Sequence, residues 1–271
     1  MLKVRVIPTL LWKNIGLVKG IGFDSWRRVG TILPAIKVYN TREVDELILL
    51  DISATTEDRA PDYESVDGFS SECFVPLTVG GGVRELDHIR KLLRARADKI
   101  AMNTVCYDNP DLVRESSRRF GSQCIVVSID VKKKPDGGFE CFSRSGTHPT
   151  GWELAAWAKR VESLGAGEIL VTSIERDGTM QGYDLDMIRT VTSQVRIPVI
   201  ASGGAGNYQH MFDAIDSAKS SAVAAASIFH FTEQTPLAAK RFLADRGVWV
   251  RDVNAGAGSQ TGDAPARSGG N

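Results

Sequence analysis

The sequence predicts a single (βα)₈ barrel of the TIM type, with an internal two-fold repeat and a short tail. Its length of 271 residues suits one α/β barrel. Short runs rich in Val and Ile alternate with amphipathic segments, which is the pattern of repeated βα units. We expect the barrel to occupy residues 1–253. Residues 254–271 are rich in Gly, Ala and Ser, have almost nothing to bury, and are predicted to be a disordered tail.

Eight apolar runs are the predicted barrel strands. In chain order they are 3–11, 46–52, 76–80, 99–103, 123–131, 167–173, 198–202 and 221–226. Each is followed by a segment with helical spacing, such as 86–97 and 152–165. In the second of these, Leu154, Trp157 and Val161 fall on one face, together with Ala158, as a helix packed on a barrel requires. Residues 132–146 contain Pro-Asp-Gly-Gly and predict a small hairpin over the rim.

An internal repeat supports closure of these strands into a barrel. Three pairs of segments match at a spacing of 122: 44–53 with 166–175, 76–82 with 198–204, and 99–105 with 221–227. Two copies of a (βα)₄ half explain this recurrence. Eight parallel strands from two such halves leave no open sheet edge.

Composition excludes several function classes. Lys plus Arg equals Asp plus Glu, 33 each, so no overall field favours nucleic acid or a membrane surface. The start, MLKVRVIPTLL, resembles a strand rather than a signal peptide, and no later run is long enough to span a bilayer. The four cysteines lack C-x-x-C spacing and are predicted to be reduced thiols of a cytoplasmic protein. The four histidines form no metal motif, so neither metal nor cofactor is expected.

Two phosphate-binding loops are predicted at the carboxyl ends of the strands. Glycines follow strands three and seven, where they let backbone amides approach an anion, although such glycines also serve ordinary turns. Small polar residues follow strands four and eight and lead into a helix. The residues are Gly81, Gly82, Asn103 and Thr104 in the first half, and Gly203, Gly204, Ala226 and Ser227 in the second. Two such loops on opposite sides of the barrel predict an elongated ligand with two phosphates.

Several motifs resemble one family. They are VGGGVR (79–84), DKIAMNT (98–104), FGSQCIVVSIDVK (120–132), GAGEILVTSIERDGT (165–179), IPVIASGGAG (197–206) and AAASIFHF (224–231). From about residue 2 to 251 the chain resembles the HisF family, the cyclase subunit of imidazole glycerol phosphate synthase. The resemblance implies a heterodimer with a HisH-like glutaminase, whose ammonia travels through the barrel to a bisphosphate substrate.

The family's catalytic pair is incomplete in this sequence. In the family, aspartates at the ends of strands one and five act as general acid and base, because one carboxyl can stay ionised while the other carries a proton. Asp130 matches the strand-five residue, but Leu11 stands at the strand-one position. The repeat places IDVK (129–132) over LLWK (10–13), so Leu11 is expected to face Asp130. We therefore expect Asp130 to be the catalytic residue without its usual partner.

Other rim residues are weaker candidates. Asp177 and Gly178, in the RDGT loop after strand six, are expected to contact substrate or to orient the loop. Asp51 closes strand two and either binds a substrate hydroxyl or has a structural role. Lys19, in the long loop predicted after strand one, is either a mobile cation that covers the ligand or a solvated lysine.

Charged residues also mark the opposite end of the barrel. Four of them lie at the starts of strands one, two, four and six: Arg5, Glu46, Lys99 and Glu168. By resemblance they form a ring at the mouth of the ammonia passage; the alternative is a ring that serves stability alone. Asp98 and Gln123 lie on the same face and match positions that the family uses against the glutaminase.

Three functions remain open at this stage. The first is a histidine-pathway cyclase, which makes imidazole glycerol phosphate and a carboxamide ribotide from a formimino-ribulosyl precursor and ammonia. The second is a paralogue of the WbuZ type, in which barrel and glutaminase supply ammonia to a sugar amidotransferase that makes an acetamidino sugar of surface polysaccharide. TLLWKNIGLVKG (9–20) resembles the leucine-rich strand one of that group, which favours the second function. A non-catalytic phosphate-binding barrel, the third, leaves the charged ring unexplained.

Overall fold

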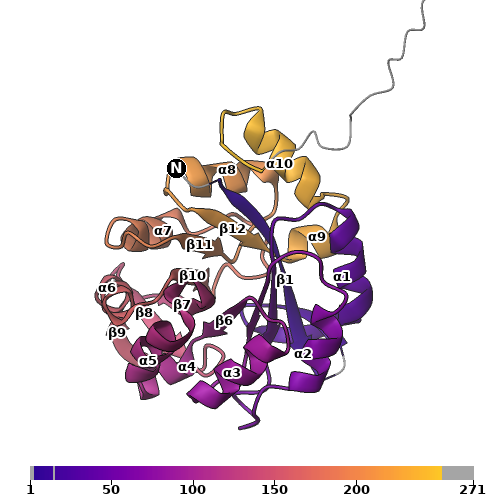
Figure 1. The fold of residues 1–271 in the computed structure, drawn as a ribbon. Coiled ribbons are helices and arrows are strands. Elements are labelled where there is room, and N and C mark those ends of the chain that lie inside the picture. The colour runs from indigo at the N-terminus through magenta and orange to yellow at the C-terminus, as the bar shows by residue number, and fades with distance from the viewer. Residues whose placement is uncertain (1–2, 15, 252–271) are drawn as a thin grey trace, which may run out of the picture.

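A computed structural model describes residues 3–14 and 16–251, and the predicted tail lies outside these residues. Within the described ranges, eight parallel strands close into a barrel in the order β1-β4-β5-β6-β7-β10-β11-β12 (Figure 1). They are β1 Arg5–Lys13, β4 Leu47–Asp51, β5 Leu77–Gly80, β6 Lys99–Met102, β7 Ile125–Lys133, β10 Glu168–Ser173, β11 Val199–Ser202 and β12 Ala222–Ala225. All eight predicted strands are confirmed.

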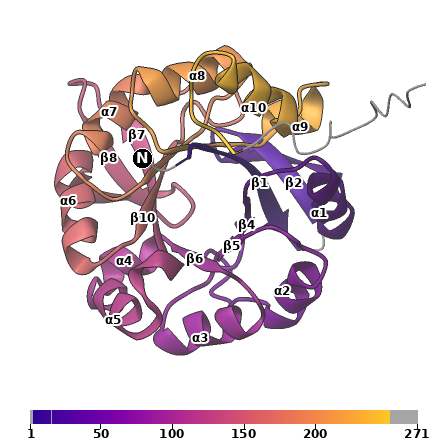
Figure 2. The same ribbon diagram turned by 45° about the horizontal axis from the view of Figure 1, so that its top comes forward.

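Helices form a ring around the strands, which the view along the barrel makes plain (Figure 2). They are α1 Ile32–Thr41, α2 Tyr63–Ser70, α3 Leu86–Arg94, α4 Thr104–Asp108, α5 Asp111–Phe120, α6 Leu154–Leu164, α7 Leu185–Thr192, α8 Tyr208–Asp216, α9 Ser227–Phe231 and α10 Pro236–Ala244, with a short 3₁₀ turn at Ser122–Cys124. The apolar face predicted for α6 is buried, and Trp157 on it is fully enclosed. Burying this stripe against the strands is what makes the segment a barrel helix.

The internal repeat is visible in the backbone. Asn103 precedes α4 with φ −123° and ψ −82°, and Ala226 precedes α9 with φ −126° and ψ −67°. These two positions are 123 residues apart rather than 122. The spacing predicted for the third pair of segments is therefore wrong by one residue, because the short apolar runs there can be aligned in either register.

Two extra hairpins lie on the rim. β2 Gly16–Ile21 and β3 Asp24–Gly30 extend antiparallel from β1. The prediction of a long loop after strand one is therefore wrong, because this segment forms a hairpin. Gly22 and Phe23 between them have φ of 61° and 63°, the left-handed pair of a tight two-residue turn. After β7, β8 Phe139–Ser143 forms the predicted rim hairpin, and β9 His148–Glu153 adds a further strand to it.

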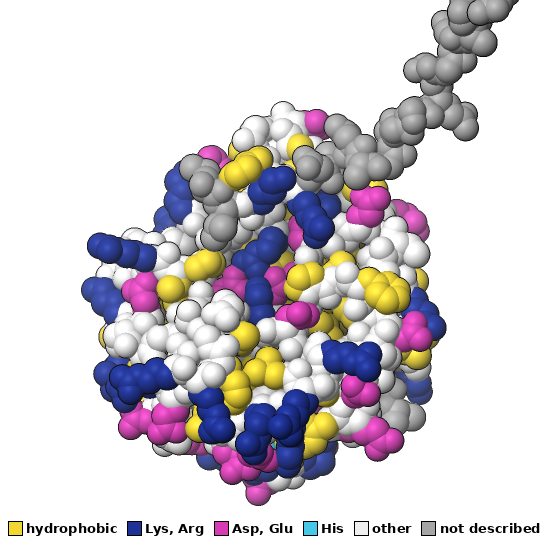
Figure 3. All heavy atoms as spheres, in the orientation of Figure 1, with side chains coloured by type: hydrophobic (Ala, Val, Ile, Leu, Met, Phe, Trp, Pro, Cys, Tyr) yellow, Lys and Arg dark blue, Asp and Glu magenta, His cyan; other side chains and the backbone are white. Residues whose placement is uncertain are grey.

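The distribution of surface charges, the state of the cysteines and the character of the helices can be compared with the expectations from composition. Basic and acidic side chains are interspersed over the face shown in Figure 3, with no large area of one sign. All four cysteines are free: Cys73, Cys106, Cys124 and Cys141. Among the described helices, none has the length and apolar character needed to cross a membrane.

Candidate active site

A cavity of about 390 Å³ opens at the carboxyl ends of the barrel strands. Thr9 and Leu11 of β1 line it, as do Ser128 and Asp130 of β7. Because side chains alternate along a strand, residues two apart on β1 and on β7 point to the same interior. Leu11 and Asp130 therefore face the same cavity from opposite halves of the barrel, as the sequence predicts.

The two halves of the barrel differ in chemistry at this level. Strand pairing defines two rows of residues, each across three neighbouring strands: Asp130, Thr172 and Ser202 in one half, and Leu11, Leu50 and Gly80 in the other. The first row carries a carboxyl and two hydroxyl groups, whereas the second carries no polar side-chain atom. Within these two rows, the side chains that can transfer a proton or donate a hydrogen bond all lie in the second half of the barrel.

Asp130 is held in a dry setting. It is 9% exposed, and Asn103 donates a hydrogen bond of 2.6 Å from its Nδ2 to Asp130 Oδ2. Burial raises the pKa of Asp130 to about 7, helped by the nearby charge of Asp177 and opposed by the Asn103 hydrogen bond. A carboxyl with this pKa exchanges its proton near neutral pH, which suits a general acid or base.

Lys19 and Asp177 form a buried ion pair beside this carboxyl. Lys19 lies on β2, is only 2% exposed, and its Nζ is 2.5 Å from Asp177 Oδ2. Lys19 is thus not a solvated lysine, because the hairpin packs it inward against its partner. It lines the cavity, and its role toward a ligand stays a prediction. The Gly22 amide also donates to the Asp177 carbonyl (2.9 Å), and a Cβ on Gly178 would lie 2.2 Å from the Gly20 carbonyl oxygen. Asp177 and Gly178 thus fix the hairpin on the rim.

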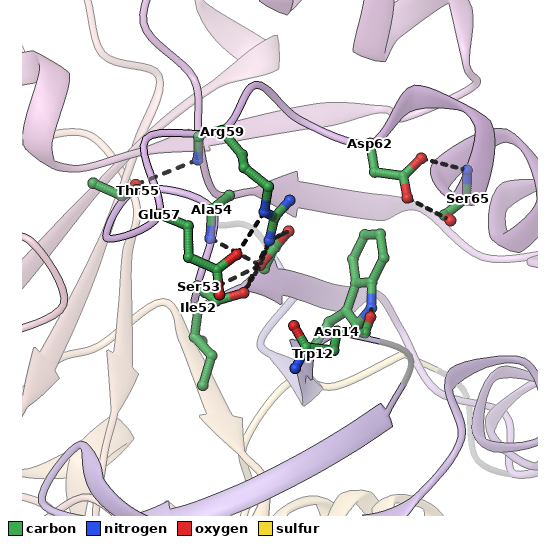
Figure 4. Close-up of polar contacts among 12 residues, drawn as sticks. Trp12, Asn14, Ile52, Ser53, Ala54, Thr55, Glu57, Arg59, Asp62 and Ser65 are labelled. Carbon is green, nitrogen blue, oxygen red and sulfur yellow. Dashed lines mark hydrogen bonds and ion pairs between the residues drawn. The ribbon is translucent and has the colours of Figure 1, made fainter.

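Asp51 braces the loop that follows β4. Its Oδ1 accepts hydrogen bonds from the backbone amides of Ser53 and Ala54, each 3.0 Å long. Arg59 reaches back to Asp51 Oδ2 at 3.2 Å and donates to Ser53 Oγ at 2.9 Å; Figure 4 shows Arg59 pointing toward Ser53 and Glu57. These partners give Asp51 a structural role. Asp51 also lines the cavity, so its binding of a substrate hydroxyl stays a prediction.

The glycines after β5 and β11 have backbone conformations that other residues rarely adopt. Gly81 and Gly204 have φ of 109° and 108°, and Gly82 and Gly203 have 71° and 88°. A Cβ at Gly81 would lie 2.2 Å from the Asp51 carbonyl oxygen, and the other three positions are similarly crowded by backbone atoms. The fold itself therefore requires glycine here. All four line the cavity. Their positions are therefore compatible with both roles considered from the sequence, which are anion binding by backbone amides and the formation of ordinary turns.

The loops after β6 and β12 complete the two predicted phosphate sites. Asn103, Thr104, Ala226 and Ser227 all line the cavity. Ser227 Oγ and Asn103 Oδ1 are buried without a protein partner. Unpaired buried polar atoms are costly, so these two atoms are available to a ligand.

Some cavity residues were missed from the sequence. They are Phe23 and Trp26 of the first rim hairpin, Arg84 after the first glycine loop, and Arg144 in the turn between β8 and β9. Arg84 was within reach of sequence reasoning, since it directly follows VGGGV. The others reach the cavity only because two hairpins fold over the rim. Among the described residues, no cluster of three His, Cys, Asp or Glu side chains is placed to hold a metal.

The four charged residues at the opposite end of the barrel form a closed ring. Arg5 Nη1 lies 2.6 Å from Glu46 Oε2, and Arg5 also pairs with Glu168. Lys99 Nζ lies 2.9 Å from Glu46 and 3.0 Å from Glu168. Thr78 Oγ1 adds a hydrogen bond of 2.7 Å to Glu46. Each glutamate is buried and bound by both cations, so the ring neutralises itself.

An apolar layer separates this ring from the cavity. It consists of Ile7, Ile48, Ala101, Val126, Leu170, Ile200, Ala222 and Ala224, with Leu50 packed against it. Leu50, Ala101, Leu170 and Ala224 also line the cavity and so form its floor. The barrel axis thus runs from charged ring through apolar layer to cavity. Asp98 and Gln123 are exposed near the starts of β6 and β7, at the end that carries the ring.

These features define a (βα)₈ barrel with a candidate active-site cavity at one end and a charged ring at the other. A family model described as histidine biosynthesis protein matches residues 5–235. Over 251 residues, the chain is 47% identical to the imidazole glycerol phosphate synthase subunit HisF of Chlorobium limicola, a match that covers 93% of this chain and 100% of that protein. The chain therefore belongs to the histidine biosynthesis protein family and is a HisF homologue.

Proposed function

We propose that this chain is the synthase subunit of a glutamine amidotransferase complex. A HisH-like glutaminase would dock on the end that carries the ring, near Asp98 and Gln123, and release ammonia there. The ammonia would pass the ring and the apolar layer and react with a phosphorylated ligand in the cavity. The observation that carries this proposal is the self-neutralised ring lying on the barrel axis, one apolar layer below the cavity that contains Asp130.

The apolar layer supports the passage of a neutral molecule. Ammonia is uncharged and small, whereas an ammonium ion would lose its hydration among these side chains at a high free-energy cost. In the ring, Lys99 and Arg5 occupy both glutamates, so neither carboxylate is free to hold a cation.

The finer proposal concerns the acceptor of ammonia. Leu11 replaces one of the two acids that the HisF resemblance assigns to the cyclase reaction, and losing a general acid or base costs about 10²–10⁴ in rate. We propose that the complex serves sugar amidation, with a separate amidotransferase that completes the acetamidino sugar. The apolar row of Leu11 and Leu50 supports this assignment, since it offers no proton donor at the position that faces Asp130.

A second candidate is the cyclase reaction of histidine biosynthesis. It is favoured by the 47% identity to the HisF subunit of C. limicola over that protein's full length. In this case Asp130 alone would handle the proton transfers, using its raised pKa, and the phosphate loops would hold the formimino-ribulosyl substrate. Both candidates share the glutaminase partner and the passage, and they differ only in the acceptor.

An isotope experiment tests the shared part of the proposal. The chain is mixed with a HisH-type glutaminase, ¹⁵N-amide glutamine, an excess of unlabelled ammonium and one candidate acceptor, either the formimino-ribulosyl substrate or a sugar with its amidotransferase. The nitrogen of the aminated product is analysed by mass spectrometry. Products of both candidate acceptors are examined. Retention of ¹⁵N is expected, because ammonia that travels inside the barrel does not mix with the bulk. Product labelled only in proportion to the bulk ammonium pool would reject the internal passage.

A further inference from the structure

Cations around the cavity are distributed unevenly. Among the described residues, three lysine or arginine side chains line it: Lys19, Arg84 and Arg144. Lys19 is buried and committed to Asp177. Arg84 pairs with Asp58, which is 89% exposed, and Arg144 lies 3.9 Å from Asp108, which is 61% exposed. Pairs with such exposed carboxylates are worth little, so both guanidinium groups can turn to a ligand at small cost.

Both of these arginines lie beside the first phosphate loop. Arg84 lies two residues after Gly82 in the chain. The Arg144 backbone amide donates a hydrogen bond of 3.0 Å to Thr104 Oγ1, which ties the turn between β8 and β9 to the loop after β6. The Thr104 hydroxyl uses its oxygen in this bond and keeps its proton for a ligand. Arg84 and Arg144 therefore flank the site from two separate segments.

The turn that carries Arg144 is fixed over the rim. Arg144, Ser145 and Gly146 have φ of 51°, 56° and 77°, three successive left-handed residues. Ser145 Oγ donates to the Ile52 carbonyl at 3.1 Å, and a Cβ on Gly146 would lie 2.9 Å from the Phe23 ring. A strained turn persists only where its surroundings hold it, and here contacts with separate rim segments do so. The backbone that carries the Arg144 side chain is thus held in place over the rim.

The second phosphate loop lacks an equivalent cation. Arg176 is near Gly204, since a Cβ on Gly204 would lie 3.1 Å from the Arg176 Cβ. However, Arg176 is exposed, donates to the Gln181 carbonyl at 3.5 Å, and does not line the cavity. What this loop offers is the unpaired hydroxyl of Ser227 and backbone amides. Its donors are therefore uncharged.

We propose that Arg84 and Arg144 are ligand-binding residues that make the first loop the subsite for a doubly charged phosphate monoester. The second loop binds its end of the ligand through uncharged donors and contributes less affinity for a dianion. Arginine binds phosphate through charge-assisted, paired hydrogen bonds, which are stronger than neutral ones. The inference deepens the proposed function, since it rests on the phosphorylated ligand proposed there, but its test requires neither ammonia nor a glutaminase.

Amide NMR with inorganic phosphate as the probe tests whether the first loop binds the dianion more tightly than the second loop. Phosphate is titrated at pH 8, where it is mostly the dianion, and the amide signals of Gly82 and Gly204 are followed separately. The Gly82 signal is expected to saturate at a phosphate concentration at least tenfold lower than the Gly204 signal. Raising the ionic strength is expected to weaken the Gly82 site more, because charge–charge attraction is screened by salt. Saturation of Gly204 first, or at the same concentration, would overturn the proposal.

Three matched variants complete the test. Arg84→Gln and Arg144→Gln each remove one charge from an exposed side chain, and each is expected to raise the Kd at Gly82 about tenfold. Arg176→Gln removes a charge of the same kind near the second loop and is expected to leave the Gly82 site within twofold. Unchanged Kd values in both Arg84→Gln and Arg144→Gln would overturn the proposal, as would an equal effect of Arg176→Gln. Failure of the isotope experiment with these shifts intact would count against the ammonia passage alone.

Discussion

Leu11 on β1 and Asp130 on β7 line one cavity from equivalent positions in the two halves of the barrel. A carboxyl that is poised near neutral pH thus faces an aliphatic side chain. The neighbouring residues extend the asymmetry, with Thr172 beside Asp130 and Leu50 beside Leu11. The frame of the barrel is symmetric, whereas at the level of Leu11 and Asp130 only the second half carries a carboxyl group.

If the chain carries out the second candidate function, the cyclase reaction, Asp130→Asn should lower its ammonia-dependent turnover by about 10²–10⁴, the usual cost of losing a general acid or base. Asparagine keeps an oxygen that can accept the Asn103 hydrogen bond, so the local geometry should survive. The rate of the unmodified protein should also depend on an ionisation near pH 7, which the variant should lack. Rates measured from pH 5 to 9 check both expectations. A variant with the same ionisation in its profile would assign it to another group.

Stability should depend on pH through the same carboxyl. Burial raises the pKa of Asp130 to about 7, above the value of about 4 for an unfolded chain. Between these values the folded protein binds a proton that the unfolded chain does not, so the free energy of unfolding should fall as pH rises from about 4 to 7. Asp130→Asn should remove this loss and be more stable than the unmodified protein at pH 8. Urea unfolding of both proteins at pH 4 and pH 8 measures their free energies of unfolding. If the variant and the unmodified protein differ by the same free energy at both pH values, the account is contradicted.

Lys19→Met should destabilise the fold by about 3–5 kcal/mol, because it leaves the Asp177 carboxylate buried without its partner. Adding Asp177→Asn should recover much of this loss. Hydrogen exchange should show faster exchange in β2 and β3 in the single variant. Lys134→Met is the matched control, since Lys134 pairs with the exposed Asp136 on the rim. Its expected effect is below about 1 kcal/mol. If the two lysine variants lose equal stability, the Lys19 pair does not anchor the hairpin.

Lys99→Met should disturb the glutamine-driven reaction more than the reaction driven by added ammonium. It leaves Glu46 and Glu168 with Arg5 as their only remaining cation in the ring, so the ring opens and the carboxylates can hold cations. Added ammonia reaches the cavity directly from its open end. The measurement is the ratio of the two rates, with Lys91→Met on the outer face of α3 as control. If this ratio is the same in Lys99→Met and in the control, the charged ring has no role in ammonia transfer.

The sequence was a good guide to the barrel and to the residues at its two ends. Strand positions followed from Val- and Ile-rich runs, because strands buried on both faces are continuously apolar. The charged ring was also expected, since Arg5, Glu46, Lys99 and Glu168 lie at or near the starts of predicted strands and the resemblance to the HisF family implies that they form a ring. Local patterns were sufficient for the strands, whereas the ring rested on the resemblance as well.

Features made by distant contacts were not predictable. The partner of Lys19 is Asp177, 158 residues further along the chain, and nothing local signals that this lysine is buried. The role of Arg144 likewise depends on a turn that meets Thr104 and Ile52 from across the rim. Residues on the two hairpins become part of the cavity only through tertiary packing.

The central claim is that the cavity has one acid, Asp130, at the two facing strand-end positions, because the other position is Leu11. Comparing the unmodified protein with Leu11→Asp tests this claim most directly. Both are given the formimino-ribulosyl substrate and ammonium salt, and release of the carboxamide ribotide is measured, with the C. limicola HisF subunit as positive control and Leu11→Asn as a non-ionising control. We predict background release by the unmodified protein and by Leu11→Asn, and at least about a 10²-fold gain in Leu11→Asp. Release by the unmodified protein at the rate of the C. limicola subunit would contradict the claim.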